Sequence, residues 1–245
     1  MTDRDGKIRL FVEADLGPGA EVPLTAEQAH YLFTVMRLGP GDPVAVFNGR
    51  DGEWIAEARP AGRRGGSLTA RRPGQPQRRP PDLWLLFAPI RKARTDFIVE
   101  KAAELGCARV APVLTRFTNA ERVRPDRLRA HAIEAAEQCG ETWVPEVAGP
   151  VRLDAALDAW DPARRLMFCD ETRDARPAAA VLAQAPRGPW AILTGPAGGF
   201  APEEAARLRS LPFVLPVTLG PRVLRADTAA VAAITLWQAI LGDWR

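Results

Sequence analysis

From residue 82 onward, strand-like apolar runs alternate with segments typical of helices, and this alternation constrains the fold more than any other feature. The apolar runs are Leu83–Ile90, Val110–Leu114, Leu166–Cys169, Trp190–Thr194 and Phe213–Leu219. Uninterrupted apolar runs are typical of parallel strands that are buried on both faces. Strands that alternate with helices predict an α/β domain with a mostly parallel sheet.

The helices between these strands carry recognisable start signals. Asp96 and Asp227 are each predicted to cap a helix, and Pro202 with the acids that follow it begins another. The last helix, from Asp227 to about Leu241, is apolar on almost every side. Such a helix is buried all round, either in the centre of the core or against a second subunit, and the sequence leaves both options open.

Two glycine-proline loops follow the last two apolar runs. They are Leu193–Phe200 and Leu219–Thr228, and each leads into a helix start. Ligands of open α/β sheets bind outside the carboxyl ends of the strands, where both loops are expected. Together the loops can place bare backbone N–H and C=O groups around a small polar ligand.

The residues of these loops exclude several common kinds of ligand-binding and catalytic site. Neither loop has the Gly-Lys-Ser/Thr of a P-loop, and their spacing does not fit a dinucleotide fingerprint. Arg222 and Arg225 stay protonated, so they are expected to stabilise negative charge rather than act as bases. An ion pair with a nearby acid is an equal alternative for Arg222. His30 and His131 have no metal-ligand neighbours and support no Ser-His-Asp triad.

The sequence before residue 82 has a different pattern, with short strand-like runs and turn signals, and this predicts a second domain. Short strand-like runs flank a strong hairpin signal at Asn48–Gly52, and Thr25 with Gln28 forms a capping-box pattern. We therefore expect a β-rich domain over residues 1–72, a basic proline-rich linker over 73–81, and the α/β domain over 82–245. The linker arginines suit contact with phosphate.

A second basic segment follows the apolar run that ends at Leu114. In it, Arg116, Asn119 and Arg122 are candidates for contact with RNA, and Phe117 could stack on a base. The segment could instead be a solvated loop that leads into a helix. Taken by itself, its sequence favours the solvated loop over RNA contact.

Compartment is indicated by what the chain lacks. No apolar run is long enough to span a bilayer, and Met1–Asp5 has no apolar core of a signal peptide. The three cysteines are scattered, with no C-x-x-C pair. The scattered cysteines predict a reducing cytoplasm and no zinc site. The lack of a long apolar run predicts no membrane partner.

Taken in order, the motifs resemble the RsmE family, the bacterial 16S ribosomal RNA uridine-N3 methyltransferases of the SPOUT superfamily. The segments that carry the resemblance are Leu193–Phe200, Leu219–Ala229, Lys101–Gly106, Glu137–Gly140 and Val144–Pro145. They are similar to the family patterns I/L-x-G-P-E-G-G-F, L-G-x-R-I/V-L-R-x-E-T-A, K-A-x-E-L-G, E-Q-S/C-G and V-P. Each piece alone is weak, but their order along nearly the whole chain is specific.

The resemblance implies an N-terminal PUA-like RNA-binding β-barrel and a C-terminal domain of the SPOUT α/β-knot type. It implies S-adenosylmethionine as cofactor, a homodimer, and 16S rRNA of the 30S subunit as partner. Arg225 becomes the candidate that stabilises the substrate anion. The implied cofactor-binding residues are Leu193, Thr194, Gly195, Pro196, Gly198, Gly199, Leu219, Gly220, Val223 and Leu224. The implied RNA-binding residues are Arg94, Arg116, Asn119, Arg122 and Arg222.

Three positions depart from the family patterns. Ala197 stands in place of glutamate, Glu141 in place of arginine, and Asp227 in place of glutamate. Ala197 motivates a rival hypothesis, a non-catalytic RNA-binding or ribosome-assembly protein with a degenerate cofactor site. A ribose 2′-O methyltransferase is a further alternative, disfavoured because the asparagine-bearing motifs of those relatives are missing.

Overall fold

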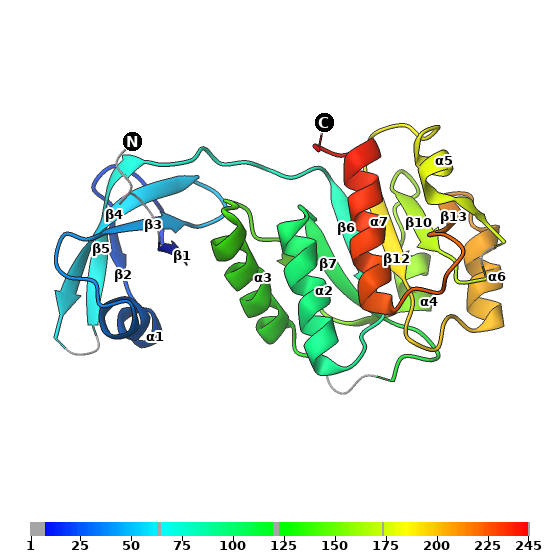
Figure 1. The fold of residues 1–245 in the computed structure, drawn as a ribbon, viewed down its shortest axis with the longest axis horizontal. Helices are drawn as coiled ribbons and strands as arrows, with labels where there is room; N and C mark the ends of the chain where they lie inside the picture. The colour runs from blue at the N-terminus through cyan, green and yellow to red at the C-terminus, as the bar shows by residue number, and fades with distance from the viewer. Residues whose placement is uncertain (1–7, 63–64, 120–122, 173, 245) are drawn as a thin grey trace. The chain divides into compact units, whose positions relative to one another are not determined.

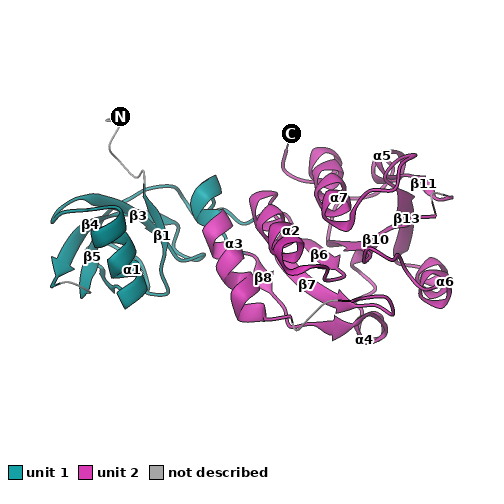
Figure 2. Ribbon diagram, turned by 60° about the horizontal axis from the view of Figure 1, so that its bottom comes forward, with its two compact units in different colours: residues 1–79, 136–144 teal, residues 80–135, 145–245 magenta. Residues whose placement is uncertain are grey.

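The computed structural model describes residues 8–62, 65–119, 123–172 and 174–244, which form two compact units (Figures 1 and 2). Unit 1 comprises residues 1–79 and 136–144, and unit 2 comprises residues 80–135 and 145–245. The sequence pattern placed residues 136–144 within the C-terminal domain, whereas in the structure they pack with the N-terminal unit.

Unit 1 is built on a five-stranded sheet in the order β1-β3-β4-β5-β2. Its elements are β1 (Arg9–Phe11), β2 (Glu21–Pro23), α1 (Ala26–His30), the π-helical turn η1 (Tyr31–Val35), β3 (Pro43–Phe47), β4 (Glu53–Ala61) and β5 (Gly65–Pro73). The hairpin predicted at Asn48–Gly52 joins the antiparallel pair β3 and β4. Gly49 and Gly52 take φ angles of 79° and 75°, which glycine adopts at little cost. The predicted capping box at Thr25 and Gln28 is also present.

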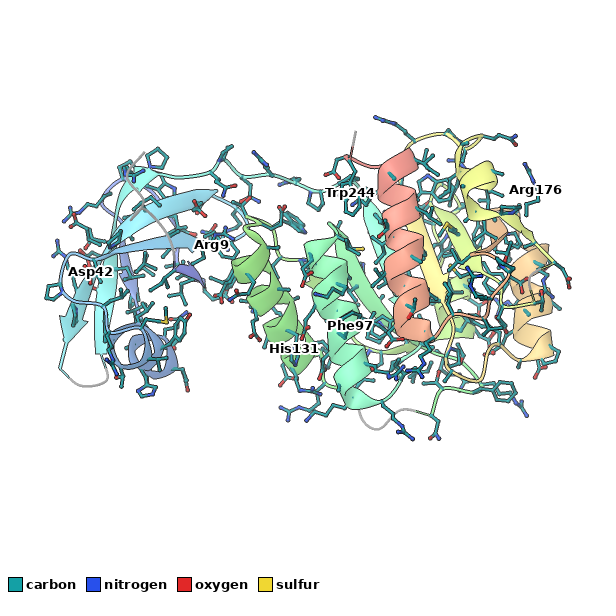
Figure 3. All side chains as sticks on the ribbon, in the orientation of Figure 1. Arg9, Asp42, Phe97, His131, Arg176 and Trp244 are labelled. Atoms are coloured by element: carbon teal, nitrogen blue, oxygen red, sulfur yellow. The ribbon has the colours of Figure 1, made fainter. Side chains whose placement is uncertain are left out.

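Residues 136–144 are fastened to unit 1 through the guanidinium group of Arg9 (Figure 3). Arg9 donates hydrogen bonds to the carbonyl oxygens of Ala136 and Glu141, at 2.8 and 2.9 Å. It also pairs with Glu53 at 2.9 Å, and both side chains are about nine-tenths buried. This buried cation thus helps to hold the last turn of α3 (Pro125–Cys139) and the residues beyond it. The N–H of Phe11 also donates to Oε1 of Glu137 at 2.8 Å, and the N–H of Arg78 donates to Oγ1 of Thr142 at 3.0 Å.

Unit 2 is organised around an eight-stranded sheet whose pairings are all parallel, as the alternation of the sequence predicted. The strand order is β11-β13-β10-β12-β6-β7-β8, with β9 beside β7. The strands are β6 (Leu83–Phe87), β7 (Arg109–Leu114), β8 (Glu146–Val147), β9 (Val151–Arg152), β10 (Arg165–Cys169), β11 (Arg176–Pro177), β12 (Trp190–Thr194) and β13 (Val214–Thr218). All five residues of β12 are buried, which identifies it as a central strand.

Helices cover both faces of this sheet. The helices of unit 2 are α2 (Lys92–Glu104), α4 (Leu153–Asp158), α5 (Ala178–Leu182), α6 (Pro202–Ser210) and α7 (Ala226–Ile240), together with α3 up to residue 135. Figure 2 shows α2 and α7 on one face and α4 on the other. The core on the α4 side gathers Leu153 and Leu157 with Ala205 and Leu208 of α6 against strand residues such as Leu193.

Two predicted helix starts are wrong in position. The N-cap of α2 is Arg91, and Asp96 lies buried within the helix, where it pairs with Arg127 of α3. The N-cap of α7 is Arg225, and Asp227 lies in the first turn. In both cases an acid that suits a helix start serves as an ion-pair partner instead, a role that only the neighbouring helix reveals. None of the helices in the described part of the chain is long and apolar enough to cross a membrane.

Candidate cofactor and RNA site

A cavity of about 920 Å³ lies in unit 2, outside the carboxyl ends of four neighbouring strands. The loops that line it follow β6, β10, β12 and β13, and the start of α7 and the loop after β7 complete the wall. Both glycine-proline loops therefore contribute to one cavity. This is the location that the general rule for open α/β sheets predicts.

The loop after β12 is held in shape by hydrogen bonds that its backbone N–H groups donate. The N–H of Gly199 donates to the carbonyl of Pro196 at 3.0 Å, and the N–H of Phe200 donates to Oε1 of Glu171 at 2.8 Å. Gly199 has a φ of 73°, and a Cβ there would lie 2.6 Å from Glu171 Oε1. A Cβ at Gly195 would lie 2.6 Å from Cε2 of Phe200. The loop therefore needs glycine at both positions.

The side chain of Thr194 indicates that the cavity suits a polar ligand. Its side chain is only 1% exposed, and its hydroxyl has no hydrogen-bond partner among the described residues. Thr194 also lines the cavity. A buried hydroxyl without a partner is costly, so a ligand that hydrogen-bonds to it gains free energy.

Glu204, in the first turn of α6, ties the basic loop after β7 to this region. Its Oε1 accepts from the backbone N–H of Arg116 at 2.8 Å, and its Oε2 accepts from that of Ala201 at 3.1 Å. The basic loop is a tight turn in which the N–H of Thr115 donates to Oγ1 of Thr118 at 2.8 Å. The carboxylate of Glu204 thus fixes the position of the turn relative to the first glycine-proline loop, Leu193–Phe200, which is called the cofactor loop below.

The loop after β13 presents cations and an apolar side chain. Gly220 has a φ of 118°, and its N–H donates to Oγ1 of Thr218 at 3.3 Å. Val223 is 73% exposed, while Arg222 and Arg225 are exposed and line the cavity. Within the described residues neither arginine has an acidic partner, so the ion pair considered for Arg222 is not formed.

Arg94, in contrast, has a partner. Its guanidinium lies 3.3 Å from Oδ2 of Asp227, which links α2 to the first turn of α7. The side chain of Arg94 is 41% exposed and lines the cavity, so one face of it stays accessible.

Three ionisable side chains at the end of β10, those of Cys169, Asp170 and Glu171, also line the cavity. Burial alone would raise the pKa of Asp170, but hydrogen bonds from Thr172 and Arg209 lower the pKa of this carboxyl below its ordinary value. Burial raises the pKa of the Cys169 thiol to about 12. Asp170 is therefore ionised and paired, and Cys169 is a neutral thiol.

Most of the predicted site residues meet at this cavity. Those that line it are Thr194, Gly195, Pro196, Gly198, Gly199, Leu219, Gly220, Val223, Leu224, Arg94, Asn119, Arg222 and Arg225. Leu193 instead lies in the core, one residue before the cavity. Arg116 lies outside the lining, and its side chain is 3.7 Å from Glu203. Arg122 falls outside the described residues.

Sequence reasoning missed the segment Pro89–Arg91, which also lines the cavity. A usable signal existed, because β6 is an apolar run of the same kind as β12. The two strands pair in parallel, so their carboxyl ends reach the same edge. The sequence alone did not reveal that they are neighbours.

Comparisons with known proteins agree with this geometry. Residues 77–238 match the RNA methyltransferase domain family, and residues 24–63 match the RNA methyltransferase PUA domain family. A ribosomal RNA small subunit methyltransferase E from Synechocystis is 30% identical over 95% of this chain and 78% of its own length. The protein of the same name from Rickettsia conorii is 26% identical over 92% and 93%.

Solved structures are similar over nearly the whole chain. A structure from Legionella pneumophila with bound S-adenosylmethionine has a TM-score of 0.86 at 28% identity, and covers 96% of this chain and 98% of its own. The ribosomal RNA small subunit methyltransferase E from Neisseria gonorrhoeae has the same fold, with a TM-score of 0.85 at 24% identity over 97% and 99%.

The fold and the cavity are those of an RNA methyltransferase that carries an N-terminal PUA domain. The predicted α/β domain with a parallel sheet and the predicted small N-terminal PUA-like domain are confirmed, and the fold is similar to that of a methyltransferase with bound S-adenosylmethionine. The knot and the closed β-barrel stay predictions. Within this class, the chain belongs to the ribosomal RNA small subunit methyltransferase E family, RsmE.

Proposed function

We propose that this enzyme transfers a methyl group from S-adenosylmethionine to N3 of a uridine in 16S ribosomal RNA. The observation that carries the proposal is one cavity that combines the two glycine-proline loops with Arg222 and Arg225, which have no acidic partner among the residues that the structure describes. Membership of the RsmE family supports the choice of RNA and cofactor.

The residues of the cavity fit the cofactor. The buried hydroxyl of Thr194 has no hydrogen-bond partner among the described residues, and the glycines after it line the cavity without a side chain. Thr194, Gly195, Gly198, Gly220 and Leu224 would hold the cofactor by this hydroxyl, by backbone N–H and C=O groups and by apolar contact. When bound, S-adenosylmethionine supplies an electrophilic methyl group on a sulfonium sulfur.

The protein must then favour the anion of the uracil ring. When N3 loses its proton, negative charge spreads to O2 and O4, and Arg225, which lines the cavity, would stabilise this charge. The N3 lone pair forms the bond to the methyl carbon as the carbon–sulfur bond breaks, which leaves S-adenosylhomocysteine. Asp170 is a weak base because of its low pKa, and Cys169 is a neutral thiol. Neither is therefore suited to take the N3 proton, and in this proposal the proton passes to water.

The 30S subunit is the partner in this proposal. Unit 1 and the basic segment 73–81 would hold the RNA, with Arg94, Arg116, Asn119 and Arg222 around the target nucleotide. Arg122 belongs to the same proposal on sequence grounds. We also place the enzyme in the cytoplasm, which the free thiols of Cys107 and Cys169 support.

The test is methylation of 30S particles that lack the modification, followed by nuclease digestion and mass spectrometry. The expected product is N3-methyluridine. A ribose-methylated nucleotide would support the 2′-O alternative, and the absence of product from an enzyme that binds both cofactor and RNA would support the non-catalytic alternative. Calorimetric titration with S-adenosylmethionine establishes cofactor binding independently.

A homodimer is the proposed assembly. The helix α7 packs against α2 and α5, yet its apolar residues Val231, Ala232 and Leu236 remain partly exposed, and Ala239 is exposed. A partly exposed apolar stripe on a helix of this kind suits burial against a second copy. Light scattering on the full chain is expected to give twice the mass of the 26.7 kDa chain. A monomeric mass would contradict the proposal.

A further inference from the structure

An exposed aromatic side chain lies at the cavity and has no role in the cofactor site. Phe117 is 47% exposed, whereas Phe87, Phe168 and Phe200, which pack in unit 2, are at most 6% exposed. Phe117 lines the cavity that the two glycine-proline loops also line. Single exposed aromatic side chains are common on protein surfaces, but the place of Phe117 in the cavity lining makes its ring available to a molecule bound there.

The position of Phe117 is built by the surrounding structure. The turn Thr115–Thr118 is closed by a hydrogen bond from the N–H of Thr118 to the carbonyl of Thr115 at 3.1 Å, and by a contact of 2.9 Å between the two hydroxyls. Glu204 anchors the turn through the N–H of Arg116. A free loop would have neither constraint. The backbone that carries the ring is therefore held at the cavity and loses little freedom on binding.

Phe117 also lies directly beside the cofactor loop. A Cβ on Gly198 would be 3.5 Å from the Cβ of Phe117, so no side chain separates the two segments. A flat ring stacked on Phe117 would therefore lie next to the loop that holds the methyl donor. Val223, the most exposed large apolar residue of the described chain, lines the same cavity from the loop after β13.

The chemistry of the substrate fits such a surface. N3 of uracil lies on the edge that pairs with another base, so the enzyme reaches it only when the base leaves its stack. Unstacking costs free energy, and a new stacking partner returns part of it. We propose that Phe117 is the surface on which the target base stacks, with Val223 as the apolar contact from the other loop. This inference rests on the proposed function.

The test compares Phe117→Ala, Phe117→Leu and Phe117→Trp with Trp244→Ala. Trp244 is the matched control, because it is 49% exposed and lies beyond the end of α7, away from the cavity lining (Figure 3). The measurements are kcat/KM for 30S particles that lack the modification, and the Kd for S-adenosylmethionine from calorimetry.

We expect Phe117→Ala to lower kcat/KM about 5- to 150-fold, the range that loss of one base–aromatic stack predicts. Phe117→Leu should lose most of the activity as well, because it keeps apolar volume without a flat ring. Phe117→Trp and Trp244→Ala should retain activity, and the Kd for S-adenosylmethionine should be unchanged throughout.

Three results would overturn the inference. They are full activity of Phe117→Ala, full activity of Phe117→Leu, and a cofactor Kd that rises in step with the loss of activity, which would indicate structural support of the loop. If the wild-type enzyme forms no N3-methyluridine, the proposed function itself fails. The affinities of wild type and Phe117→Ala for the 30S particle, measured without cofactor, then decide the role of Phe117, and equal affinities would reject it.

Discussion

Replacing Gly195 with alanine should destabilise the protein, because the first glycine-proline loop leaves no room for a side chain at this position. An added Cβ would lie 2.6, 3.1 and 3.2 Å from three carbons of the Phe200 ring. Favourable contacts between carbons lie at about 3.5–4.0 Å, so the ring must move by roughly 1 Å. Phe200 is 6% exposed and packs edge-on against Phe168, with ring centroids 5.0 Å apart. Overpacking of this kind costs about 1–3 kcal/mol of unfolding free energy.

Gly198 in the same loop is the matched control. A Cβ there meets its nearest atom at an ordinary 3.5 Å, and the backbone is outside the left-handed region. Gly198→Ala should be neutral or stabilise the fold by about 0.4–1 kcal/mol, because alanine restricts the unfolded chain. Urea denaturation measures both variants. Equal stability of Gly195→Ala and Gly198→Ala would refute the steric argument.

A double variant separates the clash with the Phe200 ring from other effects of the methyl group. Phe200→Leu removes the ring atoms that the new Cβ would meet, at the cost of some core packing. The loss for Gly195→Ala with Phe200→Leu should therefore be smaller than the sum of the two single losses. Additive losses would show that the clash with Phe200 does not set the cost.

Three further outcomes are expected. Arg225→Gln should lower the single-turnover methylation rate by about 10²–10³-fold with an unchanged cofactor Kd, since it removes a cation that stabilises the anion; a change in KM alone would argue against this. Asp170→Asn should lose about 1.5–3 kcal/mol at neutral pH in urea denaturation. Because the folded-state pKa of Asp170 lies below its ordinary 3.8, its stabilisation is present above that pH and is lost as the pH falls through the folded value, so wild type and variant should converge in acid. Arg37→Gly should gain about 0.5–1 kcal/mol in the same assay, because Arg37 has a φ of 57°, and Arg37→Ala should not.

The central strands could be predicted from sequence because burial on both faces leaves a direct mark. Trp190–Thr194 was predicted as a strand, and β12 has the same bounds, with every residue buried. The turn at Asn48–Gly52 could be predicted because positive φ angles select glycine. In these places local sequence and tertiary structure impose the same requirement.

Other features depend on partners that are distant in sequence. The strands β8, β9 and β11 contain two residues each, too few to show any period. Residues 136–144 join unit 1 partly because Arg9 binds backbone carbonyls, and a carbonyl has no sequence signature. Asp96 was taken for a helix cap because an acid near a helix start is common, yet its partner is Arg127, 31 residues away.

The carboxylates that shape the cavity bear on the departure at Ala197. Family patterns place glutamate there, and its loss suggested a degenerate site. The loop nevertheless has its shape from other contacts: Glu171 accepts from the N–H of Phe200, and the carbonyl of Pro196 accepts from that of Gly199. Both contacts go to the backbone, so they act whatever side chain residue 197 carries. A methyl group at this position leaves the loop intact and removes a charge from its rim, which affects what the cavity binds rather than whether it forms.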